Sequence, residues 1–450
     1  MRMPADVAAD WLTPAADRAV AGVVALPGSK SMTNRALVLA ALADEPTTIV
    51  GPLQARDTAL MAAAVAALGA DVVPSDPDGG TRLAGTQPVW RVAPGWRSGQ
   101  LRVDVGNAGT VLRFVPPAAA LTEADVEFDG DPRVRERPVG ELLAGLRQAG
   151  VEISDGGRGA VPFVVHGRAR VRGGTVTLDA SSSSQLVSGL MLAAPRYERG
   201  LQICHEGRRV PSAQHIAMTV AMLSGAGADV EVASAGPVDS GPDRWRIRPG
   251  RLAPGTLTIE PDLSNAAPFL AAALVTGGSV TIPGWPEVSL QPAGQILAVL
   301  SQLGATYWHD ADGLHLTGPG TIHGITADLR DINELAPVLT AVAALADSPS
   351  EFIGIGHMRL HESDRLAALA AEIGALGGEV TEQPDGLAVR PRPLRAGAGP
   401  FDSHDDHRLV MAAAVLGLVV PGLSIRNAGT VSKTFPEFRG RWLQMLGQEP

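Results

Sequence analysis

In the sequence LPGSKSMTNRALVLAALA, residues 26–43, a Pro-Gly pair is followed by a short polar segment and then by an apolar run. Pro27-Gly28 ends any regular structure that precedes it, and Ser29 or Ser31 can cap a helix that begins here. The apolar run that follows is rich in Ala and Leu, both of which favour helix. The stretch therefore predicts a helix whose start is unusually polar.

The start of this predicted helix carries two cations. Lys30 lies at the N-terminus and Arg35 about one turn further along. Because a helix N-terminus has about half a positive charge, cations there are unfavourable unless an anion is bound. Free backbone N–H groups, two hydroxyls and two cations together indicate a phosphate or carboxylate site. The alternative is a basic turn exposed to solvent.

Similar helix starts recur along the chain about every 75 residues. Each is a polar segment followed by an Ala/Leu-rich stretch, and a second helix, often ended by glycine, follows each one. Short β-branched segments lie between the helices, so each repeat predicts strands and two helices with some parallel pairing. The six starts lie near Lys30, Gly106, Ser182, Asp262, Asp331 and Asp405.

Six such units are too many for one hydrophobic core, so we expect two domains of three units each. The clearest break is residues 235–255, which are dense in Pro, Gly, Asp and Arg. If the polar helix starts face one cleft, their dipoles and cations add up there. The alternative is a single Ala-rich α/β domain in which the spacing is a coincidence.

Composition limits the classes of function. The chain has 450 residues, a net charge of −10 and a single cysteine, Cys204. The negative charge argues against non-specific nucleic-acid binding, and one cysteine cannot form an internal disulfide. The longest apolar run, Leu409–Val420, is too short to span a membrane, and Met1–Asp17 lacks the apolar core of a secretory signal. We therefore expect a cytoplasmic protein.

Further polar segments coincide with predicted helix starts. Each has a plain alternative, such as a tight turn, a solvated loop, a serine linker or a local ion pair. None has the His and carboxylate spacing of a metal site on one helix face, so no metal is predicted. Together they favour a site that handles two anions with proton transfer. The segments are residues 106–113, 131–138, 181–185, 331–334, 361–365, 405–408 and 433–438.

Seven segments, in this order, resemble the 5-enolpyruvylshikimate-3-phosphate synthases: residues 26–35, 106–113, 131–138, 181–185, 361–365, 405–408 and 433–437. The resemblance extends from residue 26 to near the C-terminus. It implies transfer of the enolpyruvyl group of phosphoenolpyruvate to the 5-hydroxyl of shikimate 3-phosphate, with inhibition by glyphosate and without a cofactor. It also implies an α/β fold, a six-fold repeated inside-out barrel, with two domains of three βαβαββ units each and the active site in the cleft between them. The implied domains are residues 1–29 with 255–450, and residues 30–254, in a monomer without membrane or nucleic-acid partners.

The resemblance also implies roles for individual residues. Lys30, Glu334 and Glu362 would be catalytic, with Glu362 transferring a proton near the reacting carbon. Shikimate 3-phosphate would contact Lys30, Ser31, Arg35, Ser183, Ser184, Gln185, Ser212, Glu334 and His361. Phosphoenolpyruvate would contact Lys30, Gly109, Arg137, Gln185, Arg365, Arg408 and Lys433.

Two positions depart from the family pattern. Glu334 stands where the family has Asp, and its side chain is one methylene longer. His361 stands where the family has Lys, so we expect a group that titrates near neutrality and an affinity for shikimate 3-phosphate that falls above neutral pH.

Two rival readings remain. One is the sister transferase that acts on UDP-N-acetylglucosamine, which usually carries a reactive loop cysteine. Cys204 lies instead at a predicted strand end. The other is a catalytically silent anion-binding scaffold, which the changes at Glu334 and His361 would permit.

Overall fold

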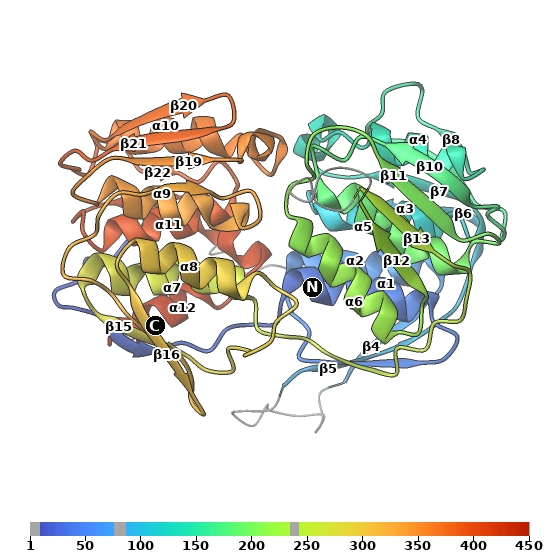
Figure 1. Ribbon diagram of the computed structural model, residues 1–450, viewed down its shortest axis with the longest axis horizontal. Helices are drawn as coiled ribbons and strands as arrows, with labels where there is room; N and C mark the ends of the chain where they lie inside the picture. Colours follow the sequence, from blue (N-terminus) through green and yellow to red (C-terminus); the bar gives the residue numbers. More distant parts are fainter. Residues whose placement is uncertain (1–9, 76–86, 235–242, 450) are drawn as a thin grey trace. The chain divides into compact units, whose positions relative to one another are not determined.

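The computed structural model describes residues 10–75, 87–234 and 243–449. The chain divides into two compact units, which we call the central unit, Gly28–Glu260, and the discontinuous unit, Met1–Pro27 with Pro261–Pro450 (Figure 1). Part of the predicted break, residues 235–242, lies outside the described residues, as do the first nine residues of Met1–Asp17. Within the described ranges, no helix is long and apolar enough to cross a membrane.

The predicted first helix is confirmed as α1, Lys30–Leu42. Ser29 is its N-cap, and the Ser29 hydroxyl accepts a hydrogen bond from the backbone N–H of Met32 at 3.5 Å. The side chains from Met32 to Leu42 are all buried. A helix that is buried on every side belongs to the interior of its domain, so α1 lies in the interior of the central unit.

The central unit contains three four-stranded sheets that share one strand order. In each sheet the first two strands are parallel, and the fourth strand lies between the second and the third, antiparallel to both. A helix follows each of the first two strands, which gives the βαβαββ unit that the resemblance implies. One unit is β6 (Ser98–Asp104), α3 (Gly109–Ala119), β7 (Glu123–Asp129), α4 (Gly140–Gln148), β8 (Glu152–Ser154) and β9 (Phe163–His166). The next is β10 (Gly174–Leu178), α5 (Ser184–Ala193), β11 (Leu201–His205), α6 (Ala213–Gly225), β12 (Val230–Ala233) and β13 (Arg244–Ile247).

The third βαβαββ repeat of the central unit combines strands from the two ends of that unit. The last strand, β14 (Thr256–Thr258), pairs in parallel with β3 (Thr47–Val50), which follows α1. The unit continues through α2 (Arg56–Leu68), β4 (Asp71–Ser75) and β5 (Val89–Ala93). The first repeat therefore takes its first strand from more than 200 residues downstream.

The discontinuous unit is built from the same kind of repeat. One βαβαββ repeat is continuous in the sequence and consists of β18 (Thr326–Asp328), α9 (Ala336–Ala344), β19 (Ser350–Ile353), α10 (Arg365–Ala375), β20 (Glu379–Gln383) and β21 (Gly386–Arg390). The second takes its first strand, β2 (Ala21–Val23), from the N-terminal segment, where β2 pairs in parallel with β15. The rest of that unit is α7 (Leu263–Thr276), β15 (Ser279–Ile282), α8 (Ala293–Gln302), β16 (Thr306–Asp310) and β17 (Gly313–Thr317).

The sixth repeat is shorter than the others. In the part of the chain that the structure describes, its sheet has three strands in the order β1-β23-β22. The elements are β22 (Phe401–Asp402), α11 (His407–Gly417), β23 (Ser424–Arg426), α12 (Phe438–Met445) and β1 (Trp11–Leu12). The described strands thus form six separate sheets and no continuous barrel wall.

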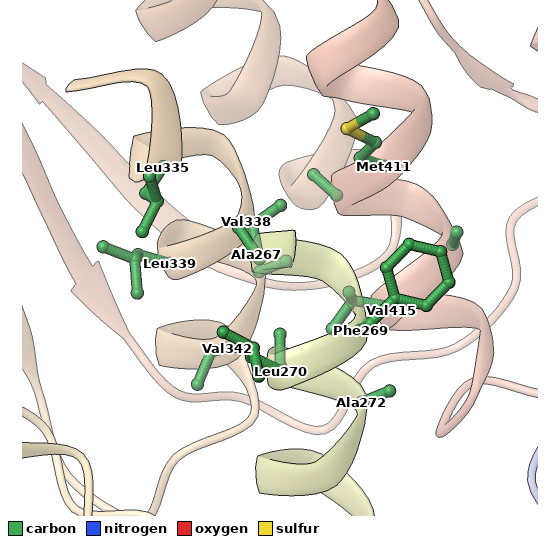
Figure 2. Close-up of a cluster of buried hydrophobic side chains, with 14 of the residues drawn as sticks. Ala267, Phe269, Leu270, Ala272, Leu335, Val338, Leu339, Val342, Met411 and Val415 are labelled. Carbon is green, nitrogen blue, oxygen red and sulfur yellow. The ribbon is translucent and has the colours of Figure 1, made fainter. Parts of the chain in front are cut away.

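The core of the discontinuous unit lies between α7, α9 and α11, each of which contacts the other two. Figure 2 shows these helices with Ala267, Val338 and Met411 among the labelled side chains of the cluster. These three side chains are at most 2% exposed. The helices α1, α3 and α5 contact one another in the same way in the central unit. Because these helices are fixed by close packing, the polar residues at their N-termini are held on a rigid base.

Candidate active site

In the central unit, Lys30 faces a buried carboxylate. The Lys30 ammonium lies 3.7 Å from Asp57 Oδ2, and the Asp57 side chain is 2% exposed. Asp57 belongs to the first turn of α2, where a negative charge is favourable. Asp57 therefore orients Lys30, and sequence reasoning missed this residue because it lies in a different helix.

Arg35 is buried and makes four hydrogen bonds within the protein. Its Nε donates to Thr219 Oγ1 at 2.7 Å, and its Nη2 donates to Ser188 Oγ at 3.3 Å and to the carbonyl of His215 at 3.0 Å. Burial lowers the pKa of Arg35 to about 9. Ser31 accepts from Nη1 through its carbonyl oxygen at 3.0 Å. Arg35 thus ties α1 to α5 and α6, while its predicted contact with shikimate 3-phosphate stays a prediction.

A second cationic cluster surrounds the start of α3. Arg137 is buried, and its Nη1 donates to the carbonyl and side-chain oxygens of Asn107 at 3.0 and 3.2 Å. Arg113 donates through Nη1 to Gln185 Oε1 at 3.3 Å and to the Gly109 carbonyl at 3.4 Å. The structure therefore brings together Gly109, Arg137 and Gln185, three predicted phosphoenolpyruvate ligands, and adds Arg113 to them.

The serine run lies at the start of α5. Ser183 is the N-cap, and its hydroxyl accepts from the backbone N–H of Gln185 at 3.3 Å. Ser184 is buried. Ser212 is the N-cap of α6 and has a left-handed backbone, with φ 53° and ψ 47°. A non-glycine residue in this conformation is strained, and such strain concentrates at functional sites.

Arg133 and Arg135, the other two arginines of residues 131–138, form local ion pairs. Arg133 pairs with Glu136, and Arg135 pairs with Asp129 at 2.8 Å, all with exposed or partly exposed side chains. For these two residues the alternative of a solvated loop is the better description.

In the discontinuous unit, Glu334 lies against two arginines. Its Oε2 is 3.1 Å from Arg408 Nε and 3.5 Å from Arg365 Nη1. Glu334 belongs to the short 3-10 helix η5, Asn333–Leu335, which precedes α9. The Glu334 side chain thus reaches both cations.

Arg365 is the centre of this cluster. Its side chain is 1% exposed, and Asp406 accepts from its Nε at 2.8 Å and from its Nη2 at 3.2 Å. Glu362 Oε2 also accepts from Nη2, at 2.9 Å. Burial alone would lower the pKa of Arg365, but Asp406, Glu362 and Glu334 outweigh it and raise this pKa. Arg365 therefore stays charged at neutral pH.

Glu362 connects Arg365 with Lys433. Its Oε1 lies 3.9 Å from Lys433 Nζ, and both side chains are largely buried. Lys433 ends the 3-10 helix η7, Ala428–Lys433. The aromatic rings of Phe435 and Phe438 follow it and pack on Phe269 with centroids 5.9 and 5.5 Å apart. The ammonium is thus presented from a rigid segment.

His361 does not match the expectation of a group that titrates near neutrality. Its Nδ1 lies 3.2 Å from Arg365 Nη1, which can only donate, so the ring accepts and is neutral. Burial and then the charge of Arg365 lower the pKa of His361 well below 6.5. His361 is therefore already uncharged at pH 7, and its titration gives no reason to expect substrate affinity to fall above neutral pH.

His357 lies beside it, with ring centroids 5.4 Å apart. Burial lowers the pKa of His357 to about 4; Arg365 and Arg330 add to this effect, and Glu334 and Asp385 oppose it. Between about pH 6.5 and pH 4 the unfolded chain binds a proton here that the folded chain does not. Stability is therefore full above about pH 6.5 and is lost as the pH falls toward 4.

We expect His357→Gln to reduce this acid sensitivity. The measurement is the midpoint of thermal unfolding, Tm, at pH 7.5 and pH 5.0. The wild-type Tm should fall more between these two pH values than the Tm of His357→Gln. The control is His323→Gln, which changes an exposed histidine of the same unit that pairs with Asp347. An equal fall in wild type and in His357→Gln would contradict the prediction.

Several supporting residues were missed, namely Asp57, Arg113, Asp262, Ser264 and Asp406. Two of them, Arg113 and Asp406, stand inside segments that the sequence analysis singled out, but their partners are distant in sequence. Over residues 10–75, 87–234 and 243–449 no group of three or more His, Cys, Asp or Glu side chains is arranged to hold a metal ion.

The fold is that of the enolpyruvyl transferases. The EPSP synthase of Acinetobacter baumannii superposes with a TM-score of 0.74 at 24% identity, over 98% of both chains. The enolpyruvyl transferase NikO of Streptomyces tendae superposes with a TM-score of 0.71 at 18% identity, over 96% of both chains. These two identities are low, so the superpositions alone establish only the fold.

Sequence comparison narrows the class to one family. The family model for EPSP synthase (3-phosphoshikimate 1-carboxyvinyltransferase) matches residues 14–442. A 3-phosphoshikimate 1-carboxyvinyltransferase from Kocuria rhizophila is 48% identical over 433 residues, which are 96% of this chain and 95% of the relative. The chain therefore belongs to the EPSP synthase family, and the sister family that acts on UDP-N-acetylglucosamine is not favoured.

Proposed function

We propose that the chain transfers the enolpyruvyl group of phosphoenolpyruvate to the 5-hydroxyl of shikimate 3-phosphate and releases phosphate. The observation that carries the proposal is Glu362. This carboxylate lies between two cations, Arg365 and Lys433, in a chain that is 48% identical to a 3-phosphoshikimate 1-carboxyvinyltransferase. A proton-transfer group beside cations is what an addition to an anionic enol phosphate needs.

The reaction needs three proton movements. In the addition, the substrate hydroxyl loses a proton and forms a bond to C2 of phosphoenolpyruvate, while the methylene carbon C3 gains a proton. In the elimination, C3 loses a proton and the C2–O bond to phosphate breaks, which releases phosphate. We assign the transfers at C3 to Glu362, and the hydroxyl proton to Glu334 or Lys30.

The remaining residues would bind substrate. We assign shikimate 3-phosphate to Lys30, Ser31, Arg35, Ser183, Ser184, Gln185, Ser212, Glu334 and His361. We assign phosphoenolpyruvate to Lys30, Gly109, Arg137, Gln185, Arg365, Arg408 and Lys433. We also propose that the two compact units are the two domains of the family fold, that the protein acts as a monomer, and that it is cytoplasmic.

The test is phosphate release by the purified protein with phosphoenolpyruvate and shikimate 3-phosphate, without added metal. A parallel reaction replaces shikimate 3-phosphate by UDP-N-acetylglucosamine. Release with shikimate 3-phosphate alone supports the proposal. Release with the sugar nucleotide alone would move the chain to the sister activity. Binding of shikimate 3-phosphate with no release in either reaction would mean a silent scaffold.

Replacing Gly109 by alanine should weaken phosphoenolpyruvate binding. A Cβ at this position would lie 2.6 Å from Arg137 Nη2 and 2.8 Å from Arg113 Nη1, so both guanidinium groups must move. We expect KM for phosphoenolpyruvate to rise about 5- to 150-fold, since such overpacking costs about 1–3 kcal/mol. The KM for shikimate 3-phosphate should change less.

The control for this variant is Gly225→Ala, at the end of α6, where a Cβ meets no atom within 4 Å. Steady-state kinetics with each substrate varied in turn measure the effect. An unchanged KM for phosphoenolpyruvate in Gly109→Ala would remove Gly109 and Arg137 from the proposed binding site.

A further inference from the structure

Arg408 is held at two atoms by one residue of a neighbouring helix. Its Nη2 donates to Ser264 Oγ at 2.6 Å, and its Nη1 donates to the Ser264 carbonyl oxygen at 2.9 Å. Ser264 lies in the first turn of α7, 144 residues from Arg408. The Arg408 side chain is 4% exposed. The serine thus contacts the edge of the guanidinium plane that carries both terminal nitrogens.

The Ser264 hydroxyl can only accept at this contact. Its hydrogen is donated to Asp262 Oδ1 at 2.6 Å, and a hydroxyl has one hydrogen. Asp262 is the N-cap of α7, and the same oxygen accepts from the backbone N–H groups of Ser264 and Asn265 at 3.1 and 3.2 Å. Because the cap fixes the carboxylate, it also fixes the direction of the hydroxyl and turns the lone pairs of Oγ toward Arg408.

The plane of the guanidinium is then defined by its two bonds to Ser264. Arg408 Nε also lies 3.1 Å from Glu334 Oε2, in an ion pair without the geometry of a hydrogen bond. The backbone of Arg408 is fixed separately, because Asp406 accepts from its N–H at 2.9 Å as the N-cap of α11. The orientation of the side chain therefore depends on Ser264, while the start of the helix does not. A guanidinium has five N–H donors, so two bonds to Ser264 leave others for an anion.

We propose that Ser264, oriented by Asp262, is a positioning residue that sets the plane of Arg408 for the carboxylate or phosphate of phosphoenolpyruvate. The inference rests on the proposed function for the identity of the anion. Two parallel N–H···O bonds need a coplanar approach, so a guanidinium that can rotate loses the bidentate contact first. A positioning role therefore predicts weaker binding of one substrate and little change in fold stability.

The test compares Ser264→Ala, which lacks the hydroxyl, with Ser264→Thr, which keeps it. Ser264→Ala should raise KM for phosphoenolpyruvate about 10- to 100-fold, the range for one hydrogen bond to a charged group. Its KM for shikimate 3-phosphate should stay within about twofold of wild type. Ser264→Thr should restore the phosphoenolpyruvate KM to within about threefold. The control is Ser301→Ala, an exposed serine near the end of α8 in the same unit.

Three outcomes would overturn the inference: an unchanged KM for phosphoenolpyruvate in Ser264→Ala, an equal rise in both KM values, or a Thr variant as impaired as the Ala variant. If the wild-type protein has no activity, the proposed function fails on its own. Crystal structures of wild type and Ser264→Ala then decide the placement of Arg408: a changed guanidinium plane in the variant supports the inference, and an unchanged plane overturns it.

Discussion

Replacing Glu362 by glutamine should lower kcat by about 10²- to 10⁴-fold, the usual contribution of one general acid–base group. Glutamine has nearly the same shape and keeps an oxygen that can accept from Arg365 Nη2, as Glu362 does at 2.9 Å. It cannot carry the transferred proton. Because binding contacts are largely kept, KM for both substrates should change far less than kcat.

Two measurements separate proton transfer from a role in positioning Arg365. The first compares the fall in kcat with the rise in KM for phosphoenolpyruvate, since a misplaced Arg365 would mainly raise this KM. The second is deuterium exchange into C3 of recovered phosphoenolpyruvate in D₂O with shikimate 3-phosphate present, which reports reversible protonation of C3. We expect exchange in wild type and almost none in Glu362→Gln.

The control is Glu379→Gln, a partly exposed glutamate on β20 that pairs with Arg392 at 2.7 Å. It should leave kcat and exchange unchanged. If Glu362→Gln retains wild-type exchange, the proton at C3 comes from another group, and Lys433, 3.9 Å from Glu362, would be the next residue to replace.

Local sequence was sufficient to predict the first helix and its cap. Ser29, the polar start and the apolar run of α1 are contiguous, so their interactions are decided within a few residues. Local sequence does not decide the role of Thr110, whose hydroxyl lies at the start of α3 but does not cap it. The N-cap is Ala108, without a side-chain bond, and the Thr110 hydroxyl instead accepts from Asn34 Nδ2 at 2.6 Å. A partner 76 residues away decided the role of this hydroxyl.

The recurring NAGTV segment makes the same point for backbone structure. Residues 107–111 lead into the α-helix α3, whereas residues 427–431 lead into the 3-10 helix η7, with Asn427 in a left-handed conformation. Five identical residues thus adopt two structures, because tertiary packing differs around them. The pairing of strands from the two ends of a compact unit, such as β14 with β3, likewise has no local signal in the sequence.

The candidate site was predictable where its residues share a segment. Glu362 and Arg365 are three residues apart, and the sequence indicated their pairing, which the structure confirms at 2.9 Å. The residues that hold the arginines were not predictable. Asp406 contacts Arg365 across 41 residues and Thr219 contacts Arg35 across 184, and nothing near either residue in the chain indicates which arginine it holds.

Replacing Asp406 by alanine should lower the free energy of unfolding by about 3–5 kcal/mol, the range for removing one partner of a buried ion pair. The Asp406 side chain is fully buried, accepts two bonds from Arg365 and one from Ser363 Oγ, and caps α11. Its loss leaves Arg365 with the carboxylates of Glu362 and Glu334 and the ring nitrogen of His361. Because these two carboxylates still offset part of the charge, we expect a value toward the lower end of the range.

Asp406→Asn removes the negative charge at position 406 but keeps the N-cap of α11. Asparagine is as good an N-cap as aspartate, so this variant should recover the contribution of the cap, about 1 kcal/mol, and lose the rest. Equilibrium unfolding in urea measures both variants, with Asp347→Asn, an exposed carboxylate of the same unit, expected within about 0.5 kcal/mol of wild type. An Arg365→Met, Asp406→Asn double variant should lose less than the sum of the single variants, because it leaves no unpaired guanidinium. Additive losses would mean that Asp406 stabilises α11 as a cap and that Glu362 and Glu334 alone hold Arg365 in place.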